Sequence, residues 1–341
     1  MRGAVLLGER QIEVWQFPDP TPGEGEVVLE MKASGICGSD LKRYRGPSSD
    51  RPREELKIGG HEPCGAVAAI GKGVEGVNIG DRVMQHHYLG CGRCRYCKIG
   101  YPQLCRTVRG YYGGSLHGGH GEYLLCAAST LVPLPDSLTF EEGASIACGT
   151  GTAYAALRKL DVSGRDTLVV YGQGPVGLSA TLLGAAMGAR VIAVDINAAR
   201  LDMAREHGAS EVLDSSQTDP IRAVQDLTEG EGADASIDCT GNAEARAQTV
   251  RSTRVFGRAC FVGEGGTVTL EPTPDIIHRH LTLYGSWTFS TFLLEDAAKF
   301  VSSRQVPVRK IITHAQPLAE IATTYRLFEG GEPGKCVVTF P

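Results

Sequence analysis

The pattern of apolar and polar positions changes character about halfway along the chain. In the first half, short stretches rich in Val, Ala and Ile, such as 27–33 and 64–71, are separated by turns dense in glycine and proline, which is typical of β-strands. In the second half an apolar strand at 167–171, a helical stretch at 176–187 and a strand at 190–195 follow one another. Strand–helix alternation predicts a parallel sheet with helices on both faces.

The alternation continues towards the C-terminus. The stretch 281–285 is short and apolar, and we expect it to form an edge of the parallel sheet. The remaining predicted elements are a strand in the first eight residues, helices at 198–207, 243–250, 293–303 and 318–329, and strands at 236–239, 259–263 and 336–340. The fold class is therefore α/β, with a doubly wound parallel sheet and a β-rich second domain.

Length and charge narrow the function classes. A chain of 341 residues predicts two domains. Its net charge of −5, without a basic tract, argues against a nucleic-acid partner, and no apolar run approaches the ~18 residues of a membrane span. Eleven cysteines without an export signal favour metal ligands or free thiols in the cytoplasm over disulfides.

Two short motifs predict a catalytic metal site. Cys37 lies in the run GICGSD, and His61 and Glu62 follow a pair of glycines. Thiolate and imidazole are the ligands that catalytic zinc uses, and Cys148 is the expected third ligand. Three protein ligands leave a position open for water or substrate. Ser39 lies two residues after Cys37 and can take a proton from the substrate.

Neighbouring residues are expected to support this site. Asp40 is predicted to brace the ligand loop and orient the histidine. Thr139 and Glu142 have the spacing of a capping box, which predicts the start of a helix that carries Cys148. For four further histidines both a substrate contact and a structural role stay open; these are His86, His87, His117 and His120.

A second metal site is predicted in a cysteine-rich loop. Cys91, Cys94, Cys97 and Cys105 are separated by two, two and seven residues. Four thiolates complete a tetrahedral zinc shell without an open position, so this site is structural. Disulfides are the alternative, but three cysteines within seven residues and the missing export signal favour the metal.

The second half carries a dinucleotide fingerprint. Gly172, Gly174 and Gly177 form G-x-G-x-x-G between a strand and a helix, and Asp195 ends the next strand. The glycines serve the tight turn, the approach of the pyrophosphate and the helix–strand packing. Asp195 accepts from the adenosine ribose and repels a 2′-phosphate, so NAD is expected rather than NADP. Arg200 either pairs with Asp195, reaches the ribose or is a surface residue.

Together these motifs, in this order, resemble the zinc-dependent medium-chain alcohol dehydrogenases over essentially the whole chain. The resemblance rests on GICGSD at 35–40, GHE at 60–62, GDRV at 80–83, the four-cysteine loop, the Cys148 helix and the fingerprint with Asp195. It implies a GroES-like catalytic domain at 1–149 and 286–341, and a Rossmann NAD-binding domain at 150–285.

The resemblance also implies cofactors, partners and further site residues. It implies two zinc ions per chain, NAD, and a homodimer or homotetramer. By position, Thr152 and Val176 resemble residues that hold the nicotinamide ring. Glu62 resembles a glutamate that in some members moves onto the metal. Cys148 is like the ligand of alcohol dehydrogenases, whereas sorbitol-type enzymes usually have glutamate there.

One position departs from the family pattern. Many relatives have a histidine where Lys42 stands, and that histidine passes the proton from the ribose to solvent, so Lys42 or water is expected to replace it. The predicted function is oxidation of a secondary alcohol, polyol or cyclitol to its ketone or aldehyde, and the reverse. A threonine-type amino-alcohol dehydrogenase is an alternative, because Lys42, Arg43 and Arg45 suit an anionic group. A non-catalytic relative is another, although the chain keeps all seven metal ligands.

Overall fold

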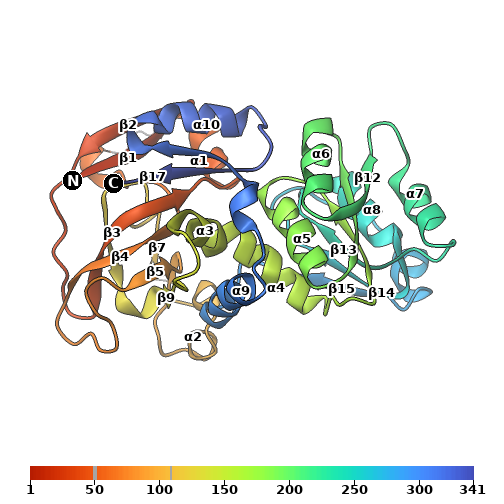
Figure 1. The fold of residues 1–341 in the computed structure, drawn as a ribbon, viewed down its shortest axis with the longest axis horizontal. Helices are drawn as coiled ribbons and strands as arrows, with labels where there is room; N and C mark the ends of the chain where they lie inside the picture. The colour runs from red at the N-terminus through yellow and green to blue at the C-terminus, as the bar shows by residue number, and fades with distance from the viewer. Residues whose placement is uncertain (49–51, 108–109) are drawn as a thin grey trace. The chain divides into compact units, whose positions relative to one another are not determined.

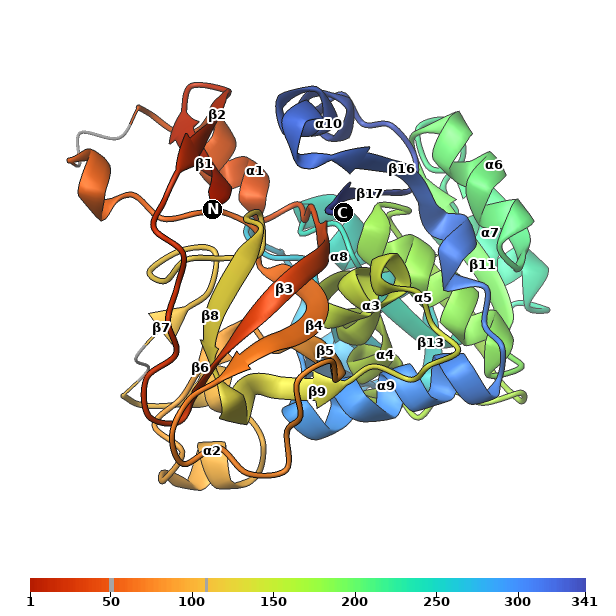
Figure 2. The same cartoon turned by 60° about the vertical axis from the view of Figure 1, so that its left-hand side comes forward.

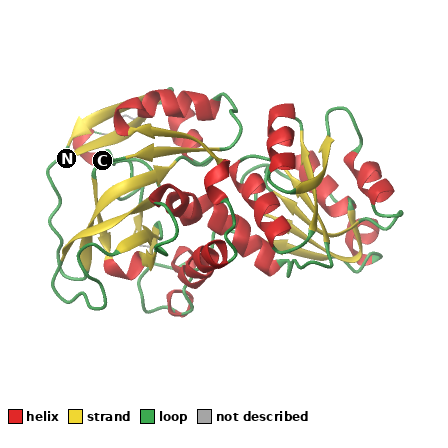
Figure 3. Cartoon of the chain, viewed as in Figure 1, coloured by secondary structure: helices red, strands yellow, loops and turns green. Residues whose placement is uncertain are grey.

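The chain forms two compact units in the computed structural model, which describes residues 1–48, 52–107 and 110–341. One unit contains Met1–Gly151 and Phe289–Pro341, and the other contains Thr152–Thr288. Figure 1 shows the chain coloured from its N-terminus to its C-terminus. Strands dominate the first unit, whereas strands and helices alternate in the second (Figure 3).

A seven-stranded sheet organises the first unit, in the order β16–β17–β3–β4–β5–β9, with β8 also paired to β3. Its strands are β3 (Glu26–Gly35), β4 (Glu62–Ile70), β5 (Arg82–Gln85), β8 (Tyr123–Ala127), β9 (Leu131–Pro133), β16 (Ile312–Pro317) and β17 (Lys335–Thr339). The late strand β17 lies antiparallel to the early strand β3, as Figure 2 shows. This pairing binds the C-terminal segment into the first unit.

Smaller elements surround that sheet. Two strand pairs are β1 (Arg2–Gly8) with β2 (Gln11–Gln16) and β6 (Tyr88–Leu89) with β7 (Gly110–Tyr111). The α-helices of this unit are α1 (Asp40–Arg45), α2 (Arg95–Lys98), α3 (Phe140–Ser145), α9 (Thr291–Ser303) and α10 (Ile321–Glu329). The shorter helical turns are η1 (Arg53–Glu55), η2 (Pro102–Leu104), η3 (Ala128–Thr130), η4 (Ile146–Thr150), η6 (Val308–Ile311) and η7 (Leu318–Glu320). One apolar core lies on β3, β4 and β8, around Leu29, Met31 and Leu124.

The second unit is a six-stranded parallel sheet in the order β12–β11–β10–β13–β14–β15. Its strands are β10 (Thr167–Tyr171), β11 (Arg190–Asp195), β12 (Ala209–Asp214), β13 (Ala233–Asp238), β14 (Thr253–Phe261) and β15 (Thr282–Gly285). In chain order this is 3-2-1-4-5-6, the doubly wound arrangement that binds dinucleotides at the strands' carboxyl ends. The predicted α/β fold class is confirmed.

Helices connect the strands of this sheet. They are α5 (Pro175–Ala186), α6 (Ala198–Glu206), α7 (Pro220–Leu227), α8 (Ala243–Arg251) and the turn η5 (Thr273–Ile277), while α4 (Gly151–Lys159) leads in from the first unit. Helices α5 and α6 pack on β10, β11 and β12, and α8 packs on β13 and β14. The sequence did not predict β12 and α7; both are short and have buried residues at only a few positions.

Candidate active site and metal centres

The four cysteines of the predicted structural site converge in the loop that contains α2 and η2. Their sulfurs all lie within 4.8 Å of one another. The Sγ–Sγ separations are 4.0 Å for Cys91–Cys97, 3.5 Å for Cys94–Cys97 and 3.9 Å for Cys94–Cys105. Zinc–sulfur bonds of about 2.3 Å in a tetrahedron place the sulfurs about 3.8 Å apart, so the four thiols fit a zinc ion.

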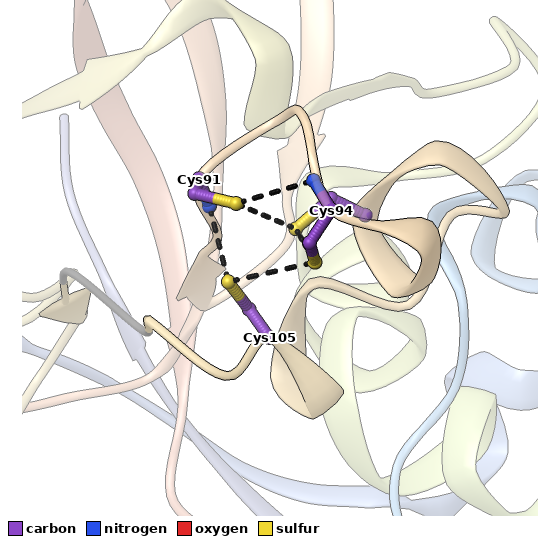
Figure 4. Close-up of side chains that lie close together, drawn as sticks. Cys91, Cys94 and Cys105 are labelled. Carbon is purple, nitrogen blue, oxygen red and sulfur yellow. Dashed lines mark hydrogen bonds between the residues drawn. The ribbon is translucent and has the colours of Figure 1, made fainter.

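Backbone donors hold these sulfurs in place, as Figure 4 shows for the three labelled cysteines. The Cys91 N–H donates to Cys105 Sγ at 3.3 Å, and the Cys94 N–H donates to Cys91 Sγ at 3.4 Å. The turn between them passes through Gly92, whose φ of +68° favours glycine. A hydrogen bond with Thr107, with backbone donors, lowers the pKa of Cys91 to about 5. A thiolate is the form that binds metal.

A second, buried group gathers the predicted catalytic ligands. One donor atom each from Cys37, His61, Glu62 and Cys148 lies within 4.8 Å of the others. Cys37 follows β3 and Glu62 begins β4, and the antiparallel register places Gly35 opposite Glu62. A Cβ at Gly35 would collide with the Glu62 carboxylate, so a larger residue there would displace that carboxylate.

Cys148 reaches this group from a π-helical turn. The predicted capping box is confirmed: Thr139 accepts from the Glu142 N–H, and the Glu142 carboxylate accepts from the Thr139 N–H. Helix α3 begins there and continues directly into η4, which carries Cys148. A hydrogen bond between the Cys37 and Cys148 side chains lowers the pKa of the Cys37 thiol well below its usual value. The donors, two sulfurs, an imidazole and a carboxylate, fit catalytic zinc.

Asp40 braces two of these ligands, as predicted. Its Oδ1 lies 2.9 Å from His61 Nδ1, and its Oδ2 accepts from the Cys37 N–H at 2.9 Å. The imidazole therefore presents Nε2 to the group, which is the usual effect of a carboxylate behind a ligand histidine. Ser39 Oγ lies 3.3 Å from the same Nε2, so the predicted proton-transfer residue is at the ligand group. Lys42 is exposed on α1.

A buried lysine behind Glu62 was not predicted. Lys335, at the start of β17, is 1% exposed, pairs with the Glu62 carboxylate and donates to the Ile36 carbonyl oxygen at 2.8 Å. Burial raises the pKa of Glu62 to about 7, against the opposing charge of Lys335. Within the described residues Glu62 Oε1 has no hydrogen-bond partner, which suits a carboxylate beside a metal. A lysine before an apolar strand gives no sequence signal for this role.

Aromatic rings adjoin the ligand histidine. The ring centroids of His87 and Tyr111 lie 5.2 and 5.7 Å from that of His61, and Tyr88 pairs with Tyr111 across β6 and β7. Burial lowers the pKa of His87 well below its usual value, which keeps the ring neutral. Tyr111 was also not predicted, because it lies in the two-residue strand β7 and belongs to no motif.

Of the four histidines whose role the sequence left open, the three besides His87 are engaged in structural contacts. His86 Nε2 lies 3.1 Å from the Phe289 carbonyl oxygen. His117 accepts from the Ile58 N–H at 3.1 Å, and His120 Nε2 lies 3.0 Å from the Tyr325 hydroxyl. These partners favour the structural role for each of the three.

The fingerprint glycines adopt the geometry that a dinucleotide turn needs. Gly172 has a φ of +85°, and a Cβ on Gly177 would collide with the Gly172 carbonyl oxygen. A Cβ on Gly174 would meet nothing within 4 Å, which leaves open space at the start of α5. This is the place where a pyrophosphate approaches the helix N-terminus.

A cavity of about 450 Å³ opens beside these glycines. Gly172, Gly174, Asp195 and Arg200 are among its lining residues, whereas Val176, Gly177 and Thr152 are not. Four further lining residues were not predicted, because they belong to no motif: Ser215 follows β12, Asn242 precedes α8, and Glu244 and Gln248 lie within α8.

Asp195 is held by the backbone around the cavity. Its Oδ2 accepts from the Gln173 N–H at 2.5 Å, and its Oδ1 accepts from the N–H groups of Ile196 and Asn197. Arg200 forms no ion pair with Asp195 among the residues that the structure covers, and its Nε is buried without a partner. Of the alternatives considered for Arg200, pairing with Asp195 is therefore not observed.

Comparison with known proteins identifies the family. Residues 23–136 match the alcohol dehydrogenase GroES-like domain, and residues 175–303 match the zinc-binding dehydrogenase family. An uncharacterized zinc-type alcohol dehydrogenase-like protein of Escherichia coli K12, YphC, is 39% identical over 100% of this chain and 99% of its own. An L-threonine 3-dehydrogenase of Xanthomonas axonopodis pv. citri is 33% identical over 99% of each chain.

Among solved structures, one described as an NAD-dependent alcohol dehydrogenase has a TM-score of 0.87 and 31% identity, covering 100% of both chains. The chain belongs to the zinc-type alcohol dehydrogenase family, a family of oxidoreductases. This confirms the resemblance seen in the motifs. Across the described residues, none of the helices has the length and apolar character needed to cross a membrane.

Proposed function

We propose that the protein is a zinc- and NAD-dependent oxidoreductase that interconverts a secondary alcohol and its ketone. The observation that carries this is the buried group of Cys37, His61, Glu62 and Cys148, with Ser39 Oγ 3.3 Å from the ligand histidine. The dinucleotide cavity of the second unit supports the cofactor. We assign the first unit as the GroES-like catalytic domain and the second as the Rossmann NAD-binding domain.

The ligand group defines what each side chain does. When bound by Cys37, His61 and Cys148, zinc supplies Lewis-acid polarisation of the substrate oxygen. Ser39 Oγ accepts the proton of the substrate hydroxyl, while Asp40 keeps the His61 ring in orientation. Lys42, which is exposed three residues after Ser39, or water then passes the proton to solvent. Bound NAD would supply the hydride acceptor, and the protein's task would be to hold the reacting carbons together.

The state of the cysteines supports a compartment. All eleven cysteines are free thiols, which supports a reducing compartment such as the cytoplasm.

The second candidate function is a threonine-type amino-alcohol dehydrogenase, which the relative of that name favours. Initial rates of NADH formation with polyols, cyclitols, simple secondary alcohols and L-threonine separate the two. Turnover of L-threonine alone would replace the first proposal by the second.

Cofactor choice gives a first prediction. We expect the unaltered protein to prefer NAD strongly over NADP, because the Asp195 carboxylate lies at the cavity where a 2′-phosphate would bring a second negative charge. Asp195→Ser should raise KM for NAD by about tenfold or more, which corresponds to a loss of ~1.4 kcal/mol of binding free energy. It should also bring the kcat/KM values for NAD and NADP closer together. Steady-state kinetics with both cofactors measure this.

The contacts of Asp195 add a structural effect to that prediction. Serine cannot replace both carboxylate oxygens, so the N–H groups of Gln173, Ile196 and Asn197 lose acceptors and the turn loosens. Asp195→Asn is the matched variant, because it removes the charge and keeps one acceptor oxygen. Equal use of NAD and NADP by the unaltered protein would show that Asp195 does not face the ribose.

Assembly gives a second prediction. Strand β15 forms an edge of the six-stranded sheet, and Leu283 on it is 36% exposed. Phe256 and Ile277 are 68% and 61% exposed. Both are hydrogen-bonded through their backbones to the segment just before β15: the Phe256 N–H donates to the Arg279 carbonyl oxygen, and the His280 N–H donates to the Ile277 carbonyl oxygen. We propose that two copies pair here as a homodimer, or as the dimer within a homotetramer. Sedimentation at micromolar concentration should show an oligomer that Leu283→Lys weakens; a monomeric unaltered protein would contradict this.

A further inference from the structure

Tyr111 has a phenol without a partner beside the ligand group. Its backbone N–H and carbonyl are bonded to Ser115, but its hydroxyl makes no hydrogen bond to any residue that the structure describes. The ring is half-buried, held between Tyr88 at 5.1 Å and His87 at 5.7 Å. The Tyr111 hydroxyl is not among the fully buried polar atoms that lack a partner, so a bound molecule or solvent can reach it.

The position of that ring points to the substrate. Its centroid is 5.7 Å from that of His61, so the ring lies next to the ligand group. The neighbouring His87 is 2% exposed and its Nδ1 also lacks a partner among the described residues. Tyr111 and His87 therefore bring two side chains with hydrogen-bonding groups next to the ligand histidine.

Resting on the function proposed above, we propose that Tyr111 selects substrates that carry a second hydroxyl on the carbon next to the reacting carbinol. The ligand group takes the oxygen that becomes the carbonyl, and the Tyr111 hydroxyl donates to the second oxygen. A simple secondary alcohol fills the same space but leaves the phenol unpaired. The substrate class is thus a vicinal diol, as found in polyols and cyclitols, oxidised to an α-hydroxy ketone while NAD accepts the hydride and one proton is released.

The test uses a matched pair of substrates, cis-1,2-cyclohexanediol and cyclohexanol, with the zinc-loaded protein and NAD. We expect the unaltered protein to favour the diol in kcat/KM by about tenfold or more, the factor that one net hydrogen bond supplies. Tyr111→Phe keeps the ring and removes the hydroxyl, so the diol-to-alcohol ratio should fall by about tenfold, mainly through KM for the diol. A structural role would change both substrates alike and leave the ratio as it was.

Tyr112→Phe is the matched control. Tyr112 is 3% exposed, and its hydroxyl accepts from the Ala127 N–H at 3.0 Å within the core. This variant should lower Tm without changing the diol-to-alcohol ratio.

Three results would overturn the inference: no preference for the diol, an unchanged ratio in Tyr111→Phe, or a preference for 2-aminocyclohexanol over the diol. In each, NADH formation from some alcohol would leave the proposed function standing. If no alcohol in the panel reduces NAD, the proposed function fails and the inference fails with it.

Discussion

Replacing Cys37 by serine is expected to lower kcat/KM for alcohol oxidation by about a thousandfold or more, because Lewis-acid stabilisation of several kcal/mol is lost and each ~1.4 kcal/mol is tenfold. Serine is a poor ligand in place of a thiolate, and the remaining donors of the group are His61, Glu62 and Cys148. Zinc content should fall from two ions to one per chain. The NAD dissociation constant should change little, because the cavity is built from the other unit.

A second cysteine separates loss of the metal from loss of packing. Cys126 is 1% exposed in the core of the first unit and takes no part in either ligand group, so Cys126→Ser should lower Tm slightly and keep two zinc ions and full activity. Full activity in Cys37→Ser would remove this residue from the catalytic centre. Equal losses of activity in both variants would mean that the serine acts through folding.

The second large effect is expected on stability. Cys105→Ser should release the zinc of the four-cysteine site and lower the free energy of unfolding by several kcal/mol, since a structural zinc contributes folding free energy directly. Cys91, Cys94 and Cys97 are only partly buried, and α2 is four residues long. Besides the cysteines, the Gln103 side chain donates to the Phe289 carbonyl oxygen, and the Thr291 N–H donates to the Gly100 carbonyl oxygen. Thermal unfolding and metal analysis of the same samples measure both quantities.

The outcome for activity distinguishes the two sites. Cys105→Ser should keep the zinc at Cys37, so the folded fraction should still oxidise alcohol at low temperature. An unchanged Tm with two retained zinc ions would contradict a structural metal at the four cysteines. A chelator that removes one zinc and abolishes activity without changing Tm would place that ion at the other group.

Local sequence patterns were sufficient to predict those sites and helix ends whose residues lie close together in the sequence. The fingerprint from Gly172 to Gly177 and the four-cysteine spacing each predict a site, because the chemistry requires those residues within a few positions. The capping box at Thr139 likewise predicted where α3 begins. Periodicity predicted the strands of the parallel sheet except β12, and the helices α5, α6 and α8. The short strands β5 to β9 of the first unit were not predicted, and neither were β12 and α7, which have few buried positions.

Roles that depend on distant partners could not be predicted in the same way. Lys335 meets Glu62 only because β17 and β4 both lie beside β3 in the sheet. Tyr111 meets His61 because β7 pairs with β6 directly after His87. Neither residue belongs to a motif, and a lysine or tyrosine in such a context is usually a surface residue or part of a core. The three backbone contacts of Asp195 also require the folded turn.

The most direct test of the proposed function is NADH formation from a panel of secondary alcohols, measured on one preparation before zinc removal, after it and after zinc is restored. The account predicts that at least one alcohol reduces NAD, that a chelator abolishes the rate while NAD still binds, and that stoichiometric zinc restores it. An undiminished rate in protein shown to lack the zinc of Cys37, His61 and Cys148 would contradict the account.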